Sequence, residues 1–243
     1  MLYVDLPESD TMRRLSFYLA MEEYVARHIL PIVAASEDDC FFIWQVAPSV
    51  IFGRNQLIEN EVNVAYCREH HIQMYRRKSG GGCVYADQNN LMLSLVTRQE
   101  NVGFAFNRFV GMLLLVLRKL GINAVGTSHN DVLIGDRKVS GTASYHLPGS
   151  NIVHGTLLYD TNMEHMLQAI TPSAEKLQSK GIQSVRQRIT LLKDYISLNV
   201  EELKTFIRAT LCHDTLLLTP AQVADIELLE QTYLQEDFIH LIS

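Results

Sequence analysis

The spacing of hydrophobic and polar positions changes along this chain, and the changes separate helices from strands. Apolar residues recur at roughly helical spacing in LSFYLAMEEYVARHI (15–29), whereas FFIWQV (41–46) and SVIFG (49–53) are short apolar runs bounded by turn residues. The elements predicted from this pattern are a helix over 15–29, strands over 41–46 and 49–53, a helix over 60–70, a strand over 72–77, a long helix over 104–120, strands over 131–134, 137–141 and 151–159, and helices after Asn199 and Thr219. Helical segments therefore flank a strand-rich middle, which predicts a mixed α and β protein.

Capping residues mark two of the helix starts. Asn199 precedes VEELKTFIRATL (200–211), and Thr219 precedes a proline and stands three residues before Gln222, the spacing of a capping box. The helix over 104–120 is so apolar that we expect it to be buried on most sides.

Composition excludes several classes of protein. With 243 residues, 47% of them hydrophobic and 20% charged, the chain can bury a sizeable core and is not disordered. A formal net charge of −6 argues against nucleic acid or an anionic membrane as the main partner. The longest uncharged apolar run, 109–117, is less than half of the roughly 20 residues that a membrane span needs, and the acidic N-terminus is unlike a signal peptide. We therefore expect a cytoplasmic protein that acts on small molecules or other proteins.

The four cysteines follow no metal-binding or disulfide pattern. Cys40, Cys67, Cys83 and Cys212 include no CxxC pair, and no histidine partner stands at zinc-finger spacing. We interpret them as reduced thiols, as in a cytosolic protein, and Cys83 as a packing residue rather than a nucleophile.

Glycine is concentrated in the middle of the chain, since all 13 glycines lie between Gly53 and Gly181. The densest group is RRKSGGGCVY (76–85), where three consecutive glycines can present backbone N–H groups to an anion next to cationic side chains. A flexible hairpin with a solvated basic strand also fits these residues, and the segment is not a P-loop because no GK[ST] follows. It is a candidate anion site.

Two further segments carry candidate chemistry. NDVLIGDRKVSG (130–141) places Lys138 in an apolar strand, where its ammonium group could stabilise charge that develops between a carboxylate and a phosphate. The alternative is an edge-strand lysine that opposes aggregation. NIVHGTLL (151–158) places His154 in a strand core, where histidine is more often structural than catalytic.

Taken together and in this order, RRKSGGGCVYADQNNLMLS, NDVLIGDRKVSGTASY and HGTLL resemble the lipoate-protein ligase family of the biotin and lipoate ligase superfamily. SVIFGRNQ (49–56), LAMEEY (19–24) and SKGIQSVRQRI (179–189) support the resemblance, which covers about residues 9–235. It implies an α+β fold with a central mixed, largely antiparallel sheet flanked by helices. It also implies one catalytic domain over 1–243, with 199–243 as a helical C-terminal segment and without the small accessory domain common in the family.

The resemblance implies a two-step ligase. ATP and lipoate give lipoyl adenylate and pyrophosphate, and the lipoyl group then moves to a lysine on a lipoyl carrier domain, such as an E2 subunit or H protein. ATP and Mg²⁺ are the implied cofactors, lipoate is the substrate, and neither nucleic acid nor a membrane is an expected partner. Such acyl transfer requires charge neutralisation at phosphate and a dry tunnel for the acyl chain.

The family's site residues carry over onto matching positions of this chain. ATP is expected to contact Arg77, Ser79, Gly82, Cys83, Val84, Tyr85, Asn130, Asp131 and Lys138. Lipoate is expected to contact Arg77, Asn90, Lys138, Ser140, Gly141 and His154. Lys138 is the expected catalytic residue, and Asp131 is expected to lie near Mg²⁺.

The chain departs from the family pattern at several positions, and two other activities stay open. Ala86 stands where the family has histidine, Asn89 to Met92 replace glycine-asparagine-leucine-asparagine, and Tyr18 replaces an asparagine. One alternative is a lipoyl or octanoyl transferase with a preformed acyl donor; a thioester route is disfavoured because 121–155 contains no cysteine. The other is a lipoate-binding subunit that needs a separate accessory protein. Biotin ligation is weaker, since the glycine-rich segment is of the lipoate type.

Overall fold

The structure, a computed structural model, describes residues 1–7, 12–33, 39–128, 131–170 and 188–241. Its strands are β1 (Leu2–Asp5), β2 (Cys40–Trp44), β3 (Ser49–Phe52), β4 (Gln73–Arg76), β5 (Val84–Ala86), β6 (Asn90–Thr97), β7 (Ala124–Gly126), β8 (Asp131–Ile134), β9 (Arg137–Leu147), β10 (Ser150–Leu158) and β11 (Asp214–Leu217). Its helices are α1 (Leu15–Tyr24), the π-helix η1 (Val25–Ile29), α2 (Ile58–Glu61), α3 (Val64–Glu69), α4 (Val102–Lys119), α5 (Met163–Ala169), the 3-10 helix η3 (Leu192–Asp194), α8 (Val200–Leu211), α9 (Pro220–Glu230), the 3-10 helix η4 (Gln231–Tyr233) and α10 (Glu236–His240). None of these helices is long and apolar enough to cross a membrane.

The described strands form a large and a small sheet. The large sheet has eight strands in the order β11-β1-β2-β6-β10-β9-β8-β7, and the small sheet has the order β4-β3-β5. The run from β2 to β7 in the large sheet is antiparallel throughout, whereas β1 pairs in parallel with β2 and β11. The predicted α+β fold with a mixed, largely antiparallel sheet is therefore confirmed.

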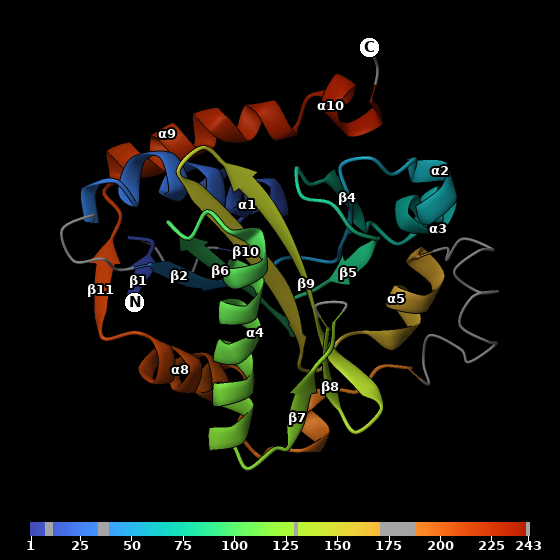
Figure 1. Cartoon of the computed structure of the whole chain (residues 1–243). Coiled ribbons are helices and arrows are strands. Elements are labelled where there is room, and N and C mark those ends of the chain that lie inside the picture. Colours follow the sequence, from blue (N-terminus) through green and yellow to red (C-terminus); the bar gives the residue numbers. More distant parts are fainter. Residues whose placement is uncertain (8–11, 34–38, 129–130, 171–187, 242–243) are drawn as a thin grey trace.

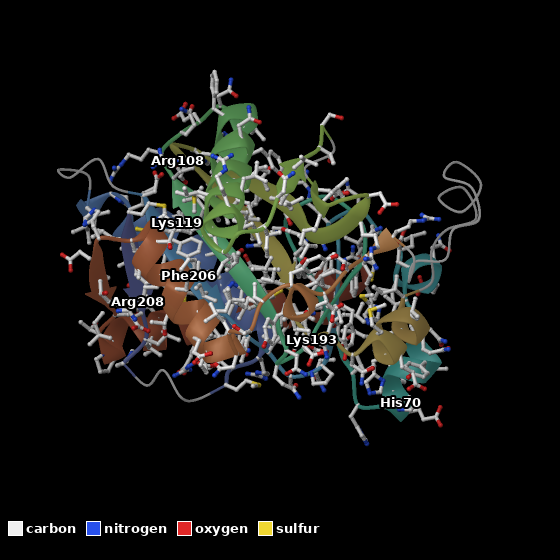
Figure 2. The ribbon with its side chains drawn as sticks, turned by 90° about the horizontal axis from the view of Figure 1, so that it is seen from below. His70, Arg108, Lys119, Lys193, Phe206 and Arg208 are labelled. Atoms are coloured by element: carbon white, nitrogen blue, oxygen red, sulfur yellow. The ribbon has the colours of Figure 1, made fainter. Side chains whose placement is uncertain are left out.

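Helices cover both faces of the large sheet, as Figure 1 shows. Because successive strand residues point to opposite faces, Phe41 and Ile43 of β2 pack in one core with α4 and α8, and Phe42 and Trp44 pack in another with α1 and α9. Figure 2 shows the first layer from below, where α8, with Phe206, lies beside α4, with Lys119. The predicted first helix is confirmed as α1 continued by η1.

The small sheet has its own cover of short helices. Its apolar residues form a third cluster with α2, α3 and α5. Although β2 and β3 are consecutive, they belong to different sheets, so the turn residues Ala47 and Pro48 between them carry the chain from the large sheet to the small one. The glycine-rich loop connects β4 to β5 of the small sheet, and its Ser79 contacts His154 on β10 of the large sheet.

The C-terminal segment contains a strand as well as helices. Both predicted caps form: the predicted capping box joins Thr219 and Gln222 at α9, and Asn199 caps α8 in a capping box with Glu202 that was not predicted. Between these helices, β11 pairs in parallel with β1 at the edge of the large sheet. The prediction of a helical segment over 199–243 therefore omitted one strand, because β11 is mostly exposed and lacks a buried face that would give an alternating pattern.

Two of the helix predictions were partly wrong. The region 60–70 holds the end of α2 and a separate α3, because Asn63 interrupts the helix and caps α3 through the backbone N–H of Tyr66. The helix α4 is not buried on most sides, since Phe104 is 63% and Leu115 is 41% exposed. Apolar residues occur on the solvent side of α4 as well as on the side that faces the sheet. The hydrophobicity of the sequence therefore does not show which side is buried.

Candidate functional site

Residues from both sheets and from α1 line a cavity of about 270 Å³. Its apolar lining consists of Leu19, Trp44, Ile51, Val84, Met92 and Ala143. Its other lining residues are Arg77, Gly81, Gly82, Cys83, Asp131, Lys138, Gly141, Thr142, His154, Gly155 and Thr156. An apolar hollow with a few convergent polar groups is typical of a small-molecule site.

The glycine-rich loop forms one wall of the cavity, and Arg77 holds that loop in shape. Its guanidinium Nη2 donates to the carbonyl oxygens of Gly80 and Gly82 at 2.6 and 2.7 Å, and Nη1 donates to the carbonyl of Ile51 at 3.1 Å. Burial lowers the pKa of Arg77 to about 10, so the group stays charged at neutral pH. Gly81 has a φ of 90°, a conformation that favours glycine. Arg77 therefore lines the cavity while most of its donors stabilise the loop.

The segment GRNQ (53–56) supports the loop from behind. A Cβ atom at Gly53 would lie only 2.3 Å from the carbonyl oxygen of Gly81, so the two backbones meet with no room for a side chain. The backbone N–H of Arg54 donates to the carbonyl of Ser79 at 3.0 Å. Glycine at position 53 is therefore required by the close approach of the two segments.

Lys138 and Asp131 meet across the β8–β9 hairpin on another part of the cavity wall. The Lys138 Nζ lies 2.7 Å from Oδ1 of Asp131, and their side chains are 38% and 27% exposed. A Cβ atom at Gly141 would lie 2.7 Å from the same Nζ, so glycine there leaves room for the ammonium group. Ile189, at the end of the SKGIQSVRQRI segment, forms an isolated bridge with Lys138, while 179–187 lie outside the described residues. A flexible cationic side chain thus borders both the cavity and solvent.

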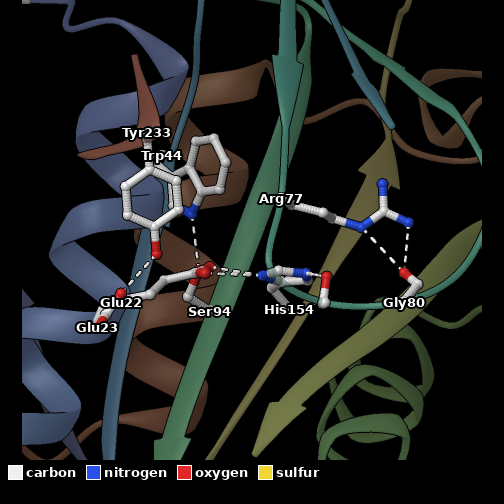
Figure 3. Close-up of polar contacts among 9 residues, drawn as sticks. Glu22, Glu23, Trp44, Arg77, Gly80, Ser94, His154 and Tyr233 are labelled. Carbon is white, nitrogen blue, oxygen red and sulfur yellow. Dashed lines mark hydrogen bonds and ion pairs between the residues drawn. The ribbon is translucent and has the colours of Figure 1, made fainter. Parts of the chain in front are cut away.

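A chain of buried hydrogen bonds runs beside the cavity from Trp44 through Ser94 and Glu22 to His154, as Figure 3 shows. Trp44 Nε1 donates to Ser94 Oγ at 2.8 Å, and Ser94 Oγ donates to a carboxylate oxygen of Glu22 at 2.5 Å. His154 Nδ1 lies 2.9 Å from Glu22 Oε2, and its Nε2 lies 2.8 Å from Ser79 Oγ. The two ring nitrogens of His154 thus contact a carboxylate on one side and a hydroxyl on the other. His154 therefore lines the cavity and ties the glycine-rich loop to α1.

The structure brings eight of the predicted site residues to the cavity: Arg77, Gly82, Cys83, Val84, Asp131, Lys138, Gly141 and His154. Four others do not line it, namely Ser79, Tyr85, Asn90 and Ser140. Ser79 is buried, and its hydroxyl lies 2.8 Å from His154 Nε2. Tyr85 is buried in the core of the small sheet, the Asn90 side chain donates to Thr161 Oγ1 at 2.9 Å, and Ser140 is fully buried. Asn130 lies outside the described residues.

The sequence reasoning missed Glu22 and Trp44 as site residues. Glu22 and its neighbour Glu23 are both 3% exposed, although they are carboxylates within an apolar helix. Because a buried carboxylate needs a partner, this pair was the signal that could have identified an internal polar site. The partners themselves come from distant segments and could not be read from the helix.

The cysteines are free thiols, and Cys83 is the one that lines the cavity. Burial raises the pKa of Cys83 to about 12 despite the opposing charge of Arg77, and burial raises that of Cys212 to about 11. Cys40 and Cys67 are fully buried. A thiol whose pKa is raised in this way stays protonated at neutral pH and is a poor nucleophile.

Comparison with known proteins identifies relatives of this arrangement. A family model described as the lipoyl protein ligase A/B catalytic domain matches residues 15–212. Lipoate-protein ligase 1 of Staphylococcus aureus is 36% identical over 200 residues, which cover 81% of this chain and 60% of that protein. This chain thus spans about 60% of the length of that relative.

Solved structures share the fold over the whole chain. A bi-partite lipoate protein ligase from Thermoplasma acidophilum, described with its E2 lipoyl domain, superposes with a TM-score of 0.81 at 24% identity and covers 100% of this chain and 96% of that one. A lipoate-protein ligase A bound with ATP superposes with a TM-score of 0.78 at 21% identity, covering 100% of this chain and 98% of that one. The chain belongs to the lipoyl protein ligase A/B catalytic domain family.

Proposed function

We propose that this chain is an ATP-dependent lipoate-protein ligase, which forms lipoyl adenylate and pyrophosphate and then transfers the lipoyl group to a lysine of a carrier domain. The observation that carries the proposal is one cavity that combines an apolar wall, the glycine-rich loop and the Lys138–Asp131 pair. Relatives named lipoate-protein ligase and a structural neighbour bound with ATP support it.

The apolar wall suits the acyl chain of lipoate. Leu19, Trp44 and Met92 line it together with other apolar residues. Each buried CH₂ group of a ligand contributes about 0.8 kcal/mol to binding. The same wall excludes water from the acyl phosphate anhydride, which is the intermediate that hydrolysis would destroy.

Lys138 and the glycine-rich loop suit the charged end of the reaction. Adenylation brings a carboxylate and an α-phosphate together, and their repulsion falls when a cation contacts both. Lys138 has a flexible, partly exposed ammonium group at the cavity, and it is the catalytic residue of this proposal. Because the Gly80 and Gly82 carbonyls are turned toward Arg77, the intervening backbone N–H groups are left for phosphate oxygens. The assigned contacts at Ser79, Tyr85, Asn90, Asn130 and Ser140 stay part of the proposal.

Mg²⁺ fits this site only as an ion shared with the nucleotide. Within the described residues, no group of three or more His, Cys, Asp or Glu is placed to hold a metal. Asp131 is a carboxylate of the cavity wall, and Mg²⁺ is commonly bound by one or two carboxylates plus substrate phosphates. In our proposal Asp131 holds the ion, which neutralises phosphate charge when bound.

The carrier is proposed to be a lipoyl domain of an E2 subunit or an H protein. One structural neighbour was described with its E2 lipoyl domain. That neighbour is also a bi-partite ligase, which favours a second candidate function. In this second form, the chain binds lipoyl adenylate and completes the transfer, and a separate accessory polypeptide is needed for adenylation.

The two forms can be separated with the purified chain. Pyrophosphate release is measured with ATP, Mg²⁺ and lipoate, and the mass of an E2 lipoyl domain is measured after addition of either these substrates or synthetic lipoyl adenylate. The complete ligase releases pyrophosphate and lipoylates the domain from both donors. Transfer from synthetic adenylate alone identifies the second form. No transfer from either donor overturns both.

A further inference from the structure

Four consecutive residues at the start of the glycine-rich loop are anchored to four different places. Arg76 Nη1 donates to the carbonyls of Gly53, Arg54 and Gln56, and its Nε donates to the carbonyl of Ile239 at 2.9 Å. Arg77 binds the loop itself, as described above. The next two anchors are Lys78, which binds Glu23, and Ser79, which binds His154. Neither Arg76 nor Lys78 lines the cavity, so these two cations are directed away from it.

Glu23 is the point at which the loop meets the C-terminal segment, as Figure 3 shows in part. Its Oε2 accepts from Lys78 Nζ at 2.6 Å and from the hydroxyl of Tyr233 at 2.8 Å. Its Oε1 accepts from Arg27 Nε and Nη2 at 3.0 and 2.8 Å. The Lys78 ammonium also lies 4.5 Å from the centre of the Tyr233 ring, a cation–π distance. One carboxylate thus joins η4, α1 and the loop.

The C-terminal segment therefore reaches the loop at two places. Tyr233 follows α9, which packs on α1 through Val223 and Ile226, and Ile239 belongs to α10. Figure 1 shows α9 and α10 running along α1 toward β4. The family match ends at residue 212, so both contacts come from a part of the chain that it does not cover.

We propose that Tyr233 is a positioning residue that fixes Lys78 through Glu23, and through Lys78 the shape of the nucleotide-binding part of the loop. The Ile239 carbonyl does the same for Arg76. This inference rests on the proposed function for the role of the loop in binding ATP. It adds that the C-terminal segment sets the geometry of the glycine-rich loop, although no residue of that segment lines the cavity.

The anchor at Lys78 lies close to the glycines in the chain. Lys78 and Ser79 are neighbours, and Ser79 leads directly into the glycines, which have no side chains to anchor them. A displacement of Lys78 is therefore transmitted along the backbone to the glycines, which Arg77 contacts at the Gly80 and Gly82 carbonyls. Because phosphate recognition depends on the placement of backbone N–H groups, nucleotide binding is the property that such a displacement weakens. Tyr233 does not line the cavity, and its hydroxyl donates to Glu23 rather than to the apolar wall for lipoate.

The test compares Tyr233→Phe with the matched control Tyr24→Phe. The Tyr24 hydroxyl also joins α1 to the C-terminal segment, through Asp225 at 3.3 Å, but it has no link to the loop. We expect Tyr233→Phe to speed hydrogen exchange of the Gly80–Cys83 amides and to raise KM for ATP, each by about tenfold, which is the scale of one hydrogen bond to a charged group. KM for lipoate is expected to stay unchanged, and Tyr24→Phe is expected to change neither property.

A second variant tests the same network from the side of the loop, at Lys78. Lys78→Met removes the ammonium group but leaves Tyr233 in place, so it covers the case in which Tyr233→Phe does not fold. If the two residues act through one contact, the double variant is no worse than the more affected single variant. Additive effects would overturn the proposal.

The outcomes separate this inference from the proposed function. If the Gly80–Cys83 amides exchange hydrogen at the same rate in Tyr233→Phe as in Tyr24→Phe, the positioning role is overturned, whatever the activity. A wild-type chain without turnover counts against the proposed function, and the exchange measurement still decides whether Tyr233 and Lys78 hold the loop.

Discussion

The ammonium nitrogen of Lys138 lies 2.7 Å from Oδ1 of Asp131, above a glycine at position 141 whose missing side chain leaves it room. Both side chains are partly exposed, so the pair can separate when a ligand carries opposite charge to either member. Lys138 can therefore leave Asp131 and stabilise the negative charge of a phosphate when one binds. The pair therefore gives the most direct route to a test by mutation.

Replacing Lys138 by alanine is expected to lower the rate of pyrophosphate release about 10²- to 10³-fold, because the developing charge loses its cation. Lys193→Ala is the matched control. Lys193 pairs with Asp160 on the surface seen in Figure 2 and does not line the cavity. Initial rates at saturating ATP and lipoate give the comparison, and equal rates for the two variants would refute the assigned role of Lys138.

A glycine pair tests the backbone contact behind the loop. Gly53→Ala places a Cβ atom 2.3 Å from the Gly81 carbonyl oxygen, whereas a Cβ atom at Gly111 on α4 meets nothing within 4 Å. We expect Gly53→Ala to destabilise the fold by about 1–3 kcal/mol, as overpacking does, and to weaken ATP binding. Gly111→Ala is expected to stabilise it by about 0.5–1 kcal/mol. Urea unfolding measures both, and equal stabilities would contradict the close approach of the two segments.

Glu23 predicts a specific acid dependence of stability. Burial alone would raise its pKa, but the hydrogen bond and charge of Lys78, with Tyr233 and Arg27, outweigh burial and hold the pKa below the ordinary value of 4.5. A pKa that is lower in the folded state stabilises the fold above pH 4.5, and this contribution is lost as the pH falls through the lowered value.

Glu23→Gln is therefore expected to lower Tm strongly at pH 7 and progressively less as the pH falls below 4.5. Glu201→Gln, which removes an exposed carboxylate from the pair with Lys204, is the control and should change Tm little at any pH. A Tm difference between Glu23→Gln and wild type that does not vary with pH would show that the carboxylate's charge is not what stabilises this site.

Cys83 distinguishes a ligase from a thioester-forming transferase. Because the pKa of its thiol is raised to about 12, this half-buried group stays protonated at pH 8 and is expected to react with iodoacetamide much more slowly than in the unfolded protein. No acyl group that hydroxylamine removes is expected on the protein after incubation with lipoyl adenylate. Mass spectrometry detects either product, and an acyl adduct on Cys83 would favour the transferase.

The fold could be predicted from the sequence where each element has a clear buried face. The apolar run of β2 and the helix caps at Asn199 and Thr219 are local features, and the structure keeps them. The strand β11 escaped prediction because its residues are mostly exposed and its order comes from pairing with β1. The burial of α4 could not be predicted, because it depends on which side of the helix packs against the sheet.

The candidate site was predictable in its motifs but not in its connections. The segments around Arg77, Lys138 and His154 all reach the cavity. The orientation of Lys78 could not be predicted, because its partner Glu23 lies 55 positions away along the chain. The same is true of His154 and Glu22, which are 132 positions apart. Such contacts are fixed by sheet topology, which short motifs do not encode.

The central claim is that lipoyl adenylate forms in the cavity that Lys138 borders. The most direct measurement incubates the purified chain with ATP, Mg²⁺ and lipoate without a carrier domain, separates protein from free ligands by gel filtration, and identifies the bound ligand by mass spectrometry. Our account predicts lipoyl adenylate on the wild-type chain and on Lys193→Ala, and none on Lys138→Ala. A wild-type chain that retains no lipoyl adenylate, or a Lys138→Ala chain that retains as much as wild type, would contradict it.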